Sequence, residues 1–501
     1  MMMKETLNLP RTDFPMKANL PEKEPQILKM WEKEGIYQRI REKFAGQPQY
    51  ILHDGPPYAN GHIHIGHALN KILKDIVVKV KTMEGYDAPY VPGWDCHGLP
   101  IEQQVEQIQG ISRKSGAEKK EVRRACRQFA EEFVTIQREE FQRLGVFGDW
   151  DRPYLTMNYG YQATILRQLG RFMAHGSLYK GMKPVHWCFS CQTALAEAEV
   201  DYEEHTSPSI YVRFPLEGEG LGEQFPSLRG LPASVVIWTT TPWTLVANLA
   251  VCLHPRYPYV AVRVDGEVWI LAQDLLEPTL ARLGVKASQI LETFPGSALE
   301  GLRCHHPFLP RESRLILGEH VTLDQGTGCV HTAPGHGQED YEIGLTYGLE
   351  VYNPVDEEGR FVSAVDHFAG MHVFEANAAV NARLKDQGHL LREETIQHSY
   401  PYCWRCHNPI IFRATPQWFV SMEVGGLRDR SLAAIRQVEW VPSWGEERIY
   451  GMIQNRPDWC ISRQRVWGVP ITVFYCTHCS EALVSQEVTE HVAAQVEREG
   501  A

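Results

Sequence analysis

The pattern of apolar and polar residues predicts two long helices in the first third of the chain. The first follows residues 61–67, because apolar residues recur there at the 3.6-residue spacing of one helical face. That stripe consists of Leu69, Ile72, Leu73, Ile76, Val80 and Met83. The second helix is predicted over Glu118–Leu144. Its stripe consists of Val122, Cys126, Phe129, Phe133, Ile136 and Phe141.

A short buried strand is predicted at Tyr50-Ile51-Leu52, just before the turn-forming residues His53–Pro57. A strand, a glycine-containing loop and a helix in this order are typical of the opening of a nucleotide-binding α/β unit. Upstream, residues 1–48 are polar and proline-rich, which predicts an extended arm leading into a short helix near Trp31.

The pattern changes to short β-type runs from about Ser207 to about Arg392. The runs SIYVRF, SVVIWT, YVAVRV and EVWILA are separated by glycine and proline turns. This segment is therefore predicted to be a separate β-rich domain.

Composition narrows the class of protein. The chain has 501 residues, 43% of them hydrophobic, which is enough for several domains with sizeable cores. It has no apolar run of the roughly 18 residues that a membrane-spanning helix needs, and its first residues lack a signal-peptide core. A net charge of −12 argues against a small basic nucleic-acid module but permits a large enzyme with a local basic groove. We therefore expect a soluble cytoplasmic protein.

Half of the twelve cysteines form three C-x-x-C pairs. The pairs Cys188/Cys191 and Cys403/Cys406 bracket the β-rich segment and together supply four thiolates, the ligand set of a structural Zn²⁺. Paired redox thiols are the alternative, although neither pair follows a thioredoxin-like βαβ start. Cys476/Cys479 has no second pair before Ala501, so no metal is assigned to it.

The sequence His64-Ile65-Gly66-His67 lies where the first helix begins. A helix N-terminus offers unpaired N–H groups and a positive dipole end, which suit phosphate. Gly66 lets a flat ring approach the backbone, and two histidines can donate hydrogen bonds to a phosphoryl group that gains charge. By itself the motif is equally compatible with histidines that cap a helix or lie on a wet surface.

The stretch Leu52–Glu102 resembles the catalytic start of class I aminoacyl-tRNA synthetases, and within that class isoleucyl rather than valyl or leucyl enzymes. The arm NLPRTDFPMKANLPEKEP and the run DWCISRQRVWGVP (458–470) are also similar to that family, so the resemblance covers essentially the whole chain. It implies that His64 and His67 stabilise the α-phosphate of ATP while the isoleucine carboxylate attacks. It also implies that Gly66 lies against adenine, Asp95 pairs with the α-ammonium group, and Pro56 lines the side-chain pocket.

A proofreading site is expected, because isoleucine and valine differ by one methylene. A hydrophobic pocket gains only about 1–3 kcal/mol from a methylene, a magnitude for which isoleucyl enzymes are themselves the standard example. Two clusters resemble the editing domain of the family: the threonine-rich loop Thr239-Thr240-Thr241, and the run Gly326–Asp340. The resemblance implies that Asp340 binds the α-ammonium group of a misacylated residue and that Thr241 and His331 hold the terminal ribose or the attacking water. Threonine in a strand and histidine beside a turn are, however, common for purely structural reasons.

The resemblance implies an α/β fold in which a β-rich editing domain interrupts a Rossmann-like catalytic domain, with a zinc-ribbon element at the junction. The expected boundaries are 1–48 for the arm, 49–187 for the first catalytic half, 188–206 and 393–412 for the junction, 207–392 for the editing domain, and 413–501 for the start of the second catalytic half. The lysine-rich KMSKS loop and the anticodon-binding domain of the family are missing, so we expect an N-terminal portion that activates isoleucine very slowly alone.

The expected cofactors are a structural Zn²⁺ and ATP with Mg²⁺, and the expected partners are isoleucine and tRNA(Ile). The protein is expected to be a monomer without a membrane partner, one that needs the missing C-terminal portion. A stand-alone hydrolase of mischarged Val-tRNA(Ile) and a non-enzymatic zinc-ribbon RNA-binding protein remain as alternatives.

Overall fold

The computed structural model describes residues 12–13, 17–112, 115–217 and 220–501, which form two compact units. The first unit consists of Met1–Arg171 with Arg465–Ala501, and the second of Phe172–Gln464. Part of the predicted N-terminal arm, residues 1–11 and 14–16, lies outside the described residues. Helices and strands are mixed throughout, so the predicted α/β class is confirmed.

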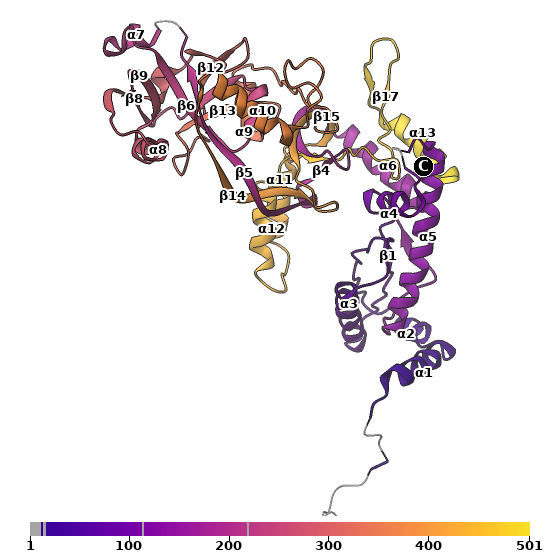
Figure 1. Cartoon of the computed structure of the whole chain (residues 1–501). Coiled ribbons are helices and arrows are strands. Elements are labelled where there is room, and N and C mark those ends of the chain that lie inside the picture. Colours follow the sequence, from indigo (N-terminus) through magenta and orange to yellow (C-terminus); the bar gives the residue numbers. More distant parts are fainter. Residues whose placement is uncertain (1–11, 14–16, 113–114, 218–219) are drawn as a thin grey trace, which may run out of the picture. The chain divides into compact units, whose positions relative to one another are not determined.

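The first unit is mainly helical (Figure 1). Its helices are α1 (Leu20–Lys33), α2 (Ile36–Phe44), α3 (Ile65–Met83), α4 (Leu99–Gln109), α5 (Lys119–Arg143), α6 (Tyr159–Ala174, which ends in the second unit) and α13 (Gln486–Glu499). Its strands are β1 (Gly93–Trp94), β2 (Tyr154–Leu155), β17 (Phe474–Tyr475) and β18 (Ala482–Leu483). The predicted helices after residue 67, near Trp31 and over 118–144 are confirmed as α3, α1 and α5.

Parallel pairing in this unit is short. Strands β1 and β2 pair in parallel, and single parallel bridges join Gln49 to Asp87 and Tyr58 to Asp95. The prediction of a buried strand at residues 50–52 is wrong: this segment belongs to no strand, and Ile51 is 71% exposed. The physical reason is that pairing stops after one bridge, leaving the segment without a ladder to bury it.

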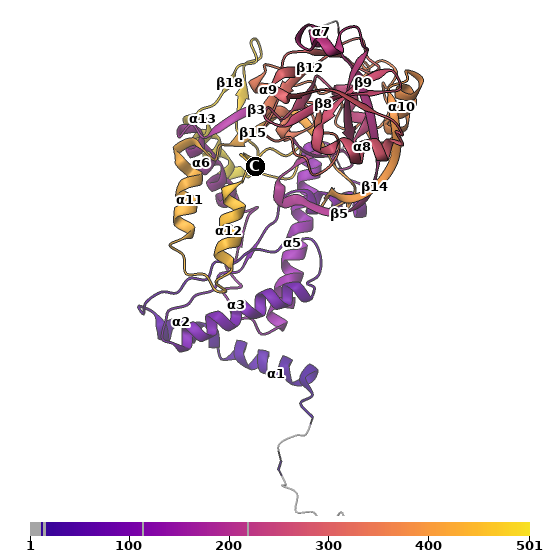
Figure 2. The ribbon, with the colours of Figure 1, turned by 90° about the vertical axis from the view of Figure 1, so that its left-hand side faces the viewer.

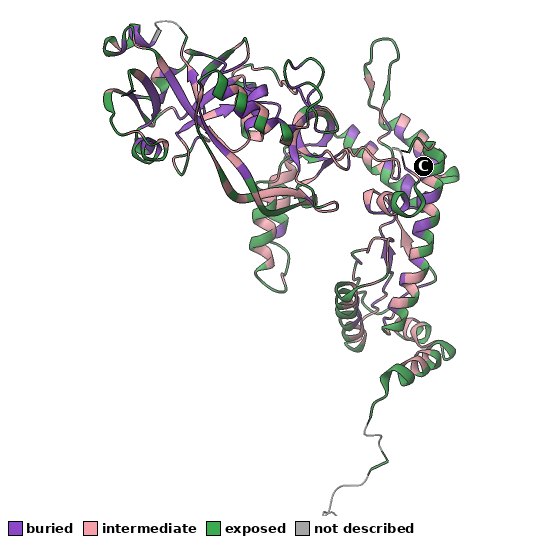
Figure 3. Ribbon diagram, viewed as in Figure 1, coloured by how far each residue is buried: buried purple, intermediate pink, exposed green. Residues whose placement is uncertain are grey.

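The apolar stripe that predicted α3 is its exposed face. All six stripe residues are exposed, and the buried residues of the helix are Lys71, Asp75 and Val78 (Figure 3). The apolar period therefore located the helix correctly but did not indicate which face is buried. In α5, by contrast, Val122, Cys126, Phe129 and Phe141 are buried, as their spacing suggests.

The core of the first unit fixes the loop that precedes α3. Trp94 is fully buried, and its indole nitrogen donates to the Gln137 side chain on α5 at 2.9 Å. The Gln137 amide in turn donates to the carbonyl oxygens of Tyr58 (3.0 Å) and Gly61 (2.7 Å). One buried glutamine on a rigid helix thus sets the path of residues 58–61, directly before the histidine motif.

The second unit is rich in strands, and the four predicted runs lie in β5, β6, β8 and β9. A six-stranded sheet has the order β10-β8-β9-β6-β5-β14, and two four-stranded sheets have the orders β11-β12-β7-β13 and β16-β15-β3-β4. The strands are β3 (Leu178–Cys188), β4 (Thr193–Leu195), β5 (Val200–Pro215), β6 (Ala233–Thr239), β7 (Ala250–Leu253), β8 (Pro258–Val264), β9 (Glu267–Ala272), β10 (Gln289–Pro295), β11 (Arg303–His305), β12 (Glu312–Leu317), β13 (Cys329–Thr332), β14 (Leu390–Cys403), β15 (Ile411–Val420) and β16 (Trp459–Cys460). The helices are α7 (Gly220–Gln224), α8 (Leu276–Leu283), α9 (Gln338–Thr346), α10 (Val373–Asp386), α11 (Leu427–Ile435) and α12 (Gly445–Gln454).

A long antiparallel ribbon of β5 and β14 leads into the six-stranded sheet. Its register runs from Val200 opposite Cys403 to Val212 opposite Leu390, and the two strands lie side by side in both views (Figures 1 and 2). The ribbon therefore brings both ends of the β-rich segment to the cysteine pairs. Among the described residues, no helix combines the length and apolar character that crossing a bilayer requires.

Candidate functional site

The histidine motif forms the N-terminal cap of α3. Nδ1 of His64, the N-cap residue, accepts the N–H of Gly66 at 3.1 Å, and Nδ1 of His67 accepts the N–H of His64 at 3.3 Å. In the neutral state each imidazole therefore carries its proton on Nε2, which is left as a donor. Capping and donation to a phosphate are thus compatible. A side chain at position 66 would meet His64, because a Cβ there would lie 2.9 Å from its Cε1.

The two imidazole rings lie close together, with centroids 3.9 Å apart, and His64 is exposed. The pKa of His67 is lowered, mainly by burial and also by the nearby His64 and Lys71. The lowered pKa favours the neutral form, which donates from Nε2. Glu140 on α5 fixes the loop directly before the motif. Its carboxylate accepts the Ile63 N–H at 2.9 Å and contacts the His62 ring at 2.5 Å. The helix start therefore combines the positive end of the helix dipole with two imidazoles whose Nε2 atoms are not used in capping.

Asp95 follows β1 and lies beside the loop that carries Pro56. Its N–H donates to the Pro57 carbonyl at 2.9 Å, and its carbonyl accepts the Ala59 N–H at 3.1 Å. Burial raises the pKa of the half-buried Asp95 carboxyl, against long hydrogen bonds from the His97 N–H (3.4 Å) and the Thr156 hydroxyl (3.5 Å). The structure thus brings the predicted Pro56 and Asp95 regions together. The carboxylate is only weakly satisfied and suits a cationic ligand.

Asp54 was not identified from the sequence, yet its carboxylate joins three segments of this site. The side chain is buried, pairs with Lys71 and with Lys74 (2.6 Å) on α3, and accepts the Gly93 N–H at 3.1 Å. Burial alone would raise the pKa of Asp54, but the two lysines outweigh it and lower the pKa. One carboxylate therefore fixes the histidine helix and the Asp95 strand to the Pro56 loop. No local signal in the sequence indicates this contact, because Lys71 and Lys74 have the pattern of solvated helix residues.

The late run 458–470 returns to the first unit at Trp467. This fully buried side chain donates from its indole nitrogen to the Cys96 carbonyl at 2.5 Å, and its ring centroid lies 4.8 Å from that of His97. The Glu102 carboxylate accepts the backbone N–H of Trp467 at 2.5 Å. Trp467, in the part of this run that belongs to the first unit, is thus packed against Cys96 and His97, directly after Asp95 in the chain.

The four predicted zinc ligands converge. The Sγ atoms of Cys188, Cys191, Cys403 and Cys406 all lie within 4.8 Å of one another. The Cys188 and Cys406 sulfurs are 3.5 Å apart, close to the roughly 3.8 Å that follows from tetrahedral Zn–S bonds of about 2.3 Å. Hydrogen bonds from Cys188, Cys191 and Cys406 lower the pKa of Cys403 and favour its thiolate. The donor set fits a four-coordinate metal with no position left for catalysis.

All three C-x-x-C pairs share one backbone turn. The residue after each second cysteine has a left-handed conformation, with φ of 52° at Gln192, 51° at His407 and 59° at Ser480. In two of the pairs, the N–H of the first cysteine donates to the carbonyl oxygen of the residue five positions later. These bonds run from Cys403 to Asn408 and from Cys476 to Glu481, both at 2.9 Å. Cys476 and Cys479 are nevertheless exposed, and no cluster of metal-ligating side chains includes them among the described residues.

His331 is locked into a buried chain of hydrogen bonds in the second unit. The Asn248 amide donates to His331 Nδ1 at 3.1 Å, so His331 donates from Nε2 to the Thr244 hydroxyl at 2.8 Å. The Thr244 hydroxyl donates to the Thr241 carbonyl at 2.7 Å. Burial lowers the pKa of His331 to about 3 and keeps it neutral. With both ring nitrogens engaged, His331 holds the threonine-rich loop in place.

Asp340 lies in the first turn of α9 and accepts the Ala333 N–H at 2.8 Å. Burial raises the pKa of its carboxyl to about 6. Thr239 is used structurally, because its hydroxyl accepts the Thr241 N–H at 3.1 Å. A Cβ at Gly335 would lie 2.1 Å from the Tyr352 carbonyl, so this turn between His331 and Asp340 needs glycine.

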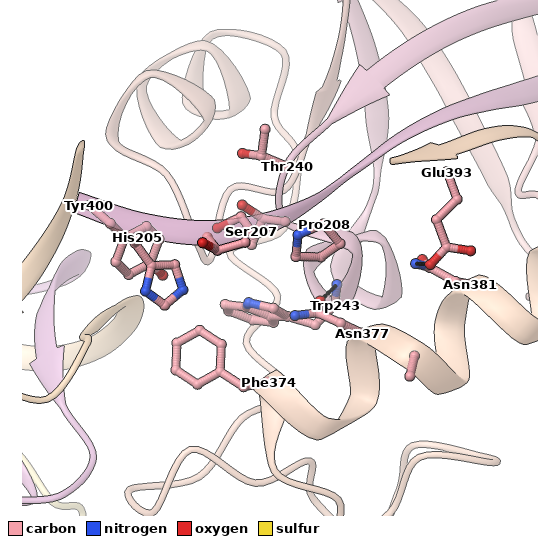
Figure 4. Close-up of a pocket in the computed structure, with 13 residues that line it drawn as sticks. His205, Ser207, Pro208, Thr240, Trp243, Phe374, Asn377, Asn381, Glu393 and Tyr400 are labelled. Carbon is pink, nitrogen blue, oxygen red and sulfur yellow. Dashed lines mark hydrogen bonds between the residues drawn. The ribbon is translucent and has the colours of Figure 1, made fainter. Parts of the chain in front are cut away.

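A cavity of about 340 Å³ opens beside the threonine-rich loop (Figure 4). Thr240, Thr241 and Trp243 line one side of it. The remaining lining comes from the β5–β14 ribbon and α10. The predicted residues Thr239, His331 and Asp340 are not among its lining residues. Sequence reasoning did not find this cavity, because its walls come from segments far apart in the chain.

Comparison with known proteins places these sites in a family. The family model of class I tRNA synthetases (I, L, M and V) matches residues 26–501. The chain therefore belongs to the class I tRNA synthetases, as its sequence resemblance implied.

Within that class, the chain is similar to isoleucine–tRNA ligases. It is 60% identical over 490 residues to that of Geobacter sulfurreducens, covering 98% of this chain and 53% of the relative. It is 58% identical over 497 residues to that of Syntrophotalea carbinolica, covering 99% and 53%. The chain thus spans about half the length of these curated relatives. A crystal structure of Agrobacterium radiobacter K84 agnB2 LeuRS with tRNA and LeuAMS is a more distant match, with 17% identity, a TM-score of 0.37, and coverage of 94% of this chain and 53% of that one.

Proposed function

We propose that the protein acts as a cytoplasmic isoleucine–tRNA ligase that activates isoleucine with ATP, transfers it to tRNA(Ile), and hydrolyses valyl products at a second site. The observation that carries this proposal is the 60% identity to an isoleucine–tRNA ligase, which extends over both units. Unit boundaries at 171/172 and 464/465 support an editing segment inserted into a catalytic one.

Activation would use the start of α3 and Asp95. Attack of the isoleucine carboxylate on the α-phosphate builds negative charge on phosphate oxygens. The helix N-terminus and the Nε2–H groups of His64 and His67 can stabilise that charge. Asp95 would bind the α-ammonium group, and Pro56 would contact the side chain. Mg²⁺ with ATP would supply charge neutralisation at the phosphates when bound.

Editing would use the threonine-rich loop and Asp340. The ammonium group of a valyl ester would pair with the Asp340 carboxylate, and Thr241 would hold the terminal ribose or the attacking water. The buried chain from Asn248 through His331 and Thr244 ends on the Thr241 carbonyl and would keep that loop rigid. Zn²⁺ at the four cysteines would have a structural role, joining the two ends of the inserted segment.

Binding of non-reactive adenylate analogues tests the activation site. We expect the protein to bind isoleucyl-sulfamoyl-adenosine more tightly than the leucyl and valyl analogues by isothermal titration calorimetry. Asp95→Ala should weaken this binding about ten- to a hundredfold, because it removes a charge-assisted contact of roughly 1.5–3 kcal/mol. Equal affinity for all three analogues would contradict the assignment to isoleucine.

Deacylation of Val-tRNA(Ile), compared with Ile-tRNA(Ile), tests the second site. We expect the valyl ester to be hydrolysed selectively. Hydrolysis without any analogue binding would instead support the alternative of a stand-alone editing hydrolase. Analogue binding without hydrolysis would remove the editing part of the proposal.

A further inference from the structure

Two hydrogen bonds within the first unit reach the Asp95 carboxylate, and both end on the same oxygen. The N–H of His97 and the hydroxyl of Thr156 donate to Oδ1, at 3.4 and 3.5 Å. Over the described part of the chain, the protein donates no hydrogen bond to Oδ2 of Asp95. The carboxylate is thus held by one oxygen, and the other is left for a cationic ligand.

The hydroxyl of Thr156 has a single proton, and its surroundings direct that proton to Asp95. The hydroxyl oxygen accepts the N–H of Cys96 at 2.8 Å. A hydroxyl has one donor and two acceptor positions, so this bond occupies an acceptor position and leaves the O–H free to donate. The O–H donates to the Asp95 carboxylate. Thr156 therefore joins the side chain of Asp95 to the backbone of the next residue.

The position of Thr156 is fixed by the parallel strands β1 and β2. Gly93 lies opposite Tyr154 in this pair, and the Thr156 N–H donates to the Trp94 carbonyl at 3.2 Å. The Tyr154 ring packs so closely over Gly93 that a Cβ there would lie 2.0 Å from it. Thr156 therefore approaches Asp95 from paired backbone and not from an unpaired loop.

The hydroxyl of Thr156 also opposes the effect of burial on the Asp95 carboxyl. Burial raises the pKa of Asp95, and the bonds from the His97 N–H and the Thr156 hydroxyl act in the other direction. Both bonds stabilise the ionised form, which is the form that a cation binds. His97 contributes through its backbone N–H, whereas Thr156 contributes through its side chain. Thr156 is therefore the residue at which this contribution can be removed by substitution.

We propose that Thr156 is a positioning residue of the activation site, whose hydroxyl holds the Asp95 carboxylate so that Oδ2 receives the α-ammonium group of the amino acid. This inference rests on the proposed function, in which Asp95 binds that group. An aspartate side chain rotates about two bonds, and fixing one oxygen gives the other a defined direction before the ligand arrives. The bond of 3.5 Å is long, as such contacts often are without a ligand, and should shorten on binding.

The test compares two non-reactive ligands that differ only in the α-ammonium group. They are isoleucyl-sulfamoyl-adenosine and 3-methylpentanoyl-sulfamoyl-adenosine, which keeps the side chain but lacks the amino group. Calorimetry on the full chain gives the ratio of their affinities, which should be about ten- to a hundredfold for wild type and near one for Asp95→Ala. Thr156→Val keeps the shape of the side chain without the hydroxyl, and should lower the ratio about three- to tenfold by weakening the isoleucyl analogue. Thr156→Ser keeps the hydroxyl and should restore the ratio.

Thr164→Val is the matched control and should keep the wild-type ratio. Thr164 is exposed, and its hydroxyl donates within α6 to the Gly160 carbonyl at 2.9 Å. Circular dichroism shows which variants are folded. If Thr156→Val is not folded, Thr156→Cys takes its place, because a thiol is a weaker donor than a hydroxyl, and it should also lower the ratio.

The possible failures of this inference and of the proposed function differ. A folded Thr156→Val protein with the wild-type ratio would overturn the inference and leave Asp95 in its proposed role. Equal weakening of both analogues would also overturn it, because Thr156 would then support the fold and not the orientation of the carboxylate. If wild type does not distinguish the analogues, or if Asp95→Ala keeps the ratio, the proposed role of Asp95 is wrong and the inference is wrong with it.

Discussion

Asp95 in the first unit and Asp340 in the second are assigned the same task, binding an α-ammonium group, in two different settings. Asp95 is half-buried beside a loop, with two long hydrogen bonds to its carboxylate. Asp340, likewise half-buried, accepts one hydrogen bond of 2.8 Å from the Ala333 N–H, and burial raises its pKa to about 6. Burial raises the pKa of both carboxyls, and that of Asp340 reaches about 6, so cation binding at the second site should weaken as the pH falls through 6.

The contacts that hold the two sites together also differ. In the first unit, the buried Asp54 carboxylate binds two lysines of α3 and the Gly93 N–H, two residues before Asp95. In the second, the cysteine cluster lies at the end of the ribbon, and a neutral hydrogen-bond chain fixes the threonine-rich loop. Each support can be removed separately, so the two sites can be separated by mutation.

The largest expected effect is loss of the metal. Changing Cys188 and Cys403 together to serine should abolish one tightly held zinc per chain. Structural zinc contributes about 10–16 kcal/mol in small zinc domains at neutral pH, so deacylation should be lost while adenylate-analogue binding persists. Metal analysis and calorimetric melting provide the measurement. The paired change of Cys476 and Cys479 to serine is the control and should keep the zinc. A wild-type protein purified without zinc under reducing conditions would refute the assignment.

Removing the support in the first unit should have the next largest effect. Asp54→Ala leaves Lys71 buried without its carboxylate, which should cost about 3–5 kcal/mol of stability. We expect adenylate-analogue binding to fall sharply and deacylation to persist. Denaturant unfolding of each variant, with the exposed Asp151→Ala as control, gives the measurement. Unchanged stability would show that Asp54 does not hold the site together.

Asp340→Ala should have a smaller effect that is confined to the second site. Removal of a charge-assisted contact of roughly 1.5–3 kcal/mol should lower Val-tRNA(Ile) hydrolysis about ten- to a hundredfold. Glu339→Ala changes the exposed neighbouring carboxylate and is the matched control. Equal hydrolysis by Asp340→Ala and wild type would remove Asp340 from the site.

The smallest effect concerns pH. Because burial raises the pKa of Asp340 to about 6, its ionised fraction falls as pH drops through 6. The kcat/KM for hydrolysis, which reports the free protein, should therefore decline below pH 6, by about tenfold per unit well below the pKa. Asp340→Asn should lose this titration. A wild-type profile that stays flat down to pH 5 would contradict the raised pKa.

Local patterns predicted the local structure well. The 3.6-residue period located α3 and α5, short β-type runs located four strands, and cysteine spacing identified a cluster whose sulfurs do meet. Each of these signals lies within a short stretch of sequence, or in an unusual residue type. The strand at 50–52 failed because a strand requires a partner, and composition cannot supply one.

Features that depend on distant contacts were not predictable. In the sequence, Lys71 and Lys74 have the pattern of solvated helix residues. In the structure, Lys71 is buried in an ion pair with Asp54. The family resemblance implies that His331 holds the terminal ribose or the attacking water. The structure shows both of its nitrogens used within the protein. The lining of the cavity beside the threonine-rich loop comes from β5, α10 and β14 as well as from the loop itself, so no single stretch of sequence carries its pattern.

The β5–β14 ribbon has a consequence for how such a protein can change over time. Because Val200 faces Cys403 across it, the polypeptide leaves and re-enters the cysteine junction at neighbouring points. Everything between these two residues is, in connectivity, the tip of one enlarged hairpin. A segment attached in this way can be lengthened, exchanged or deleted while the distance that its host must span stays the same. The ribbon therefore allows the whole inserted segment to be gained or replaced as one piece, while the backbone path of the flanking residues stays the same.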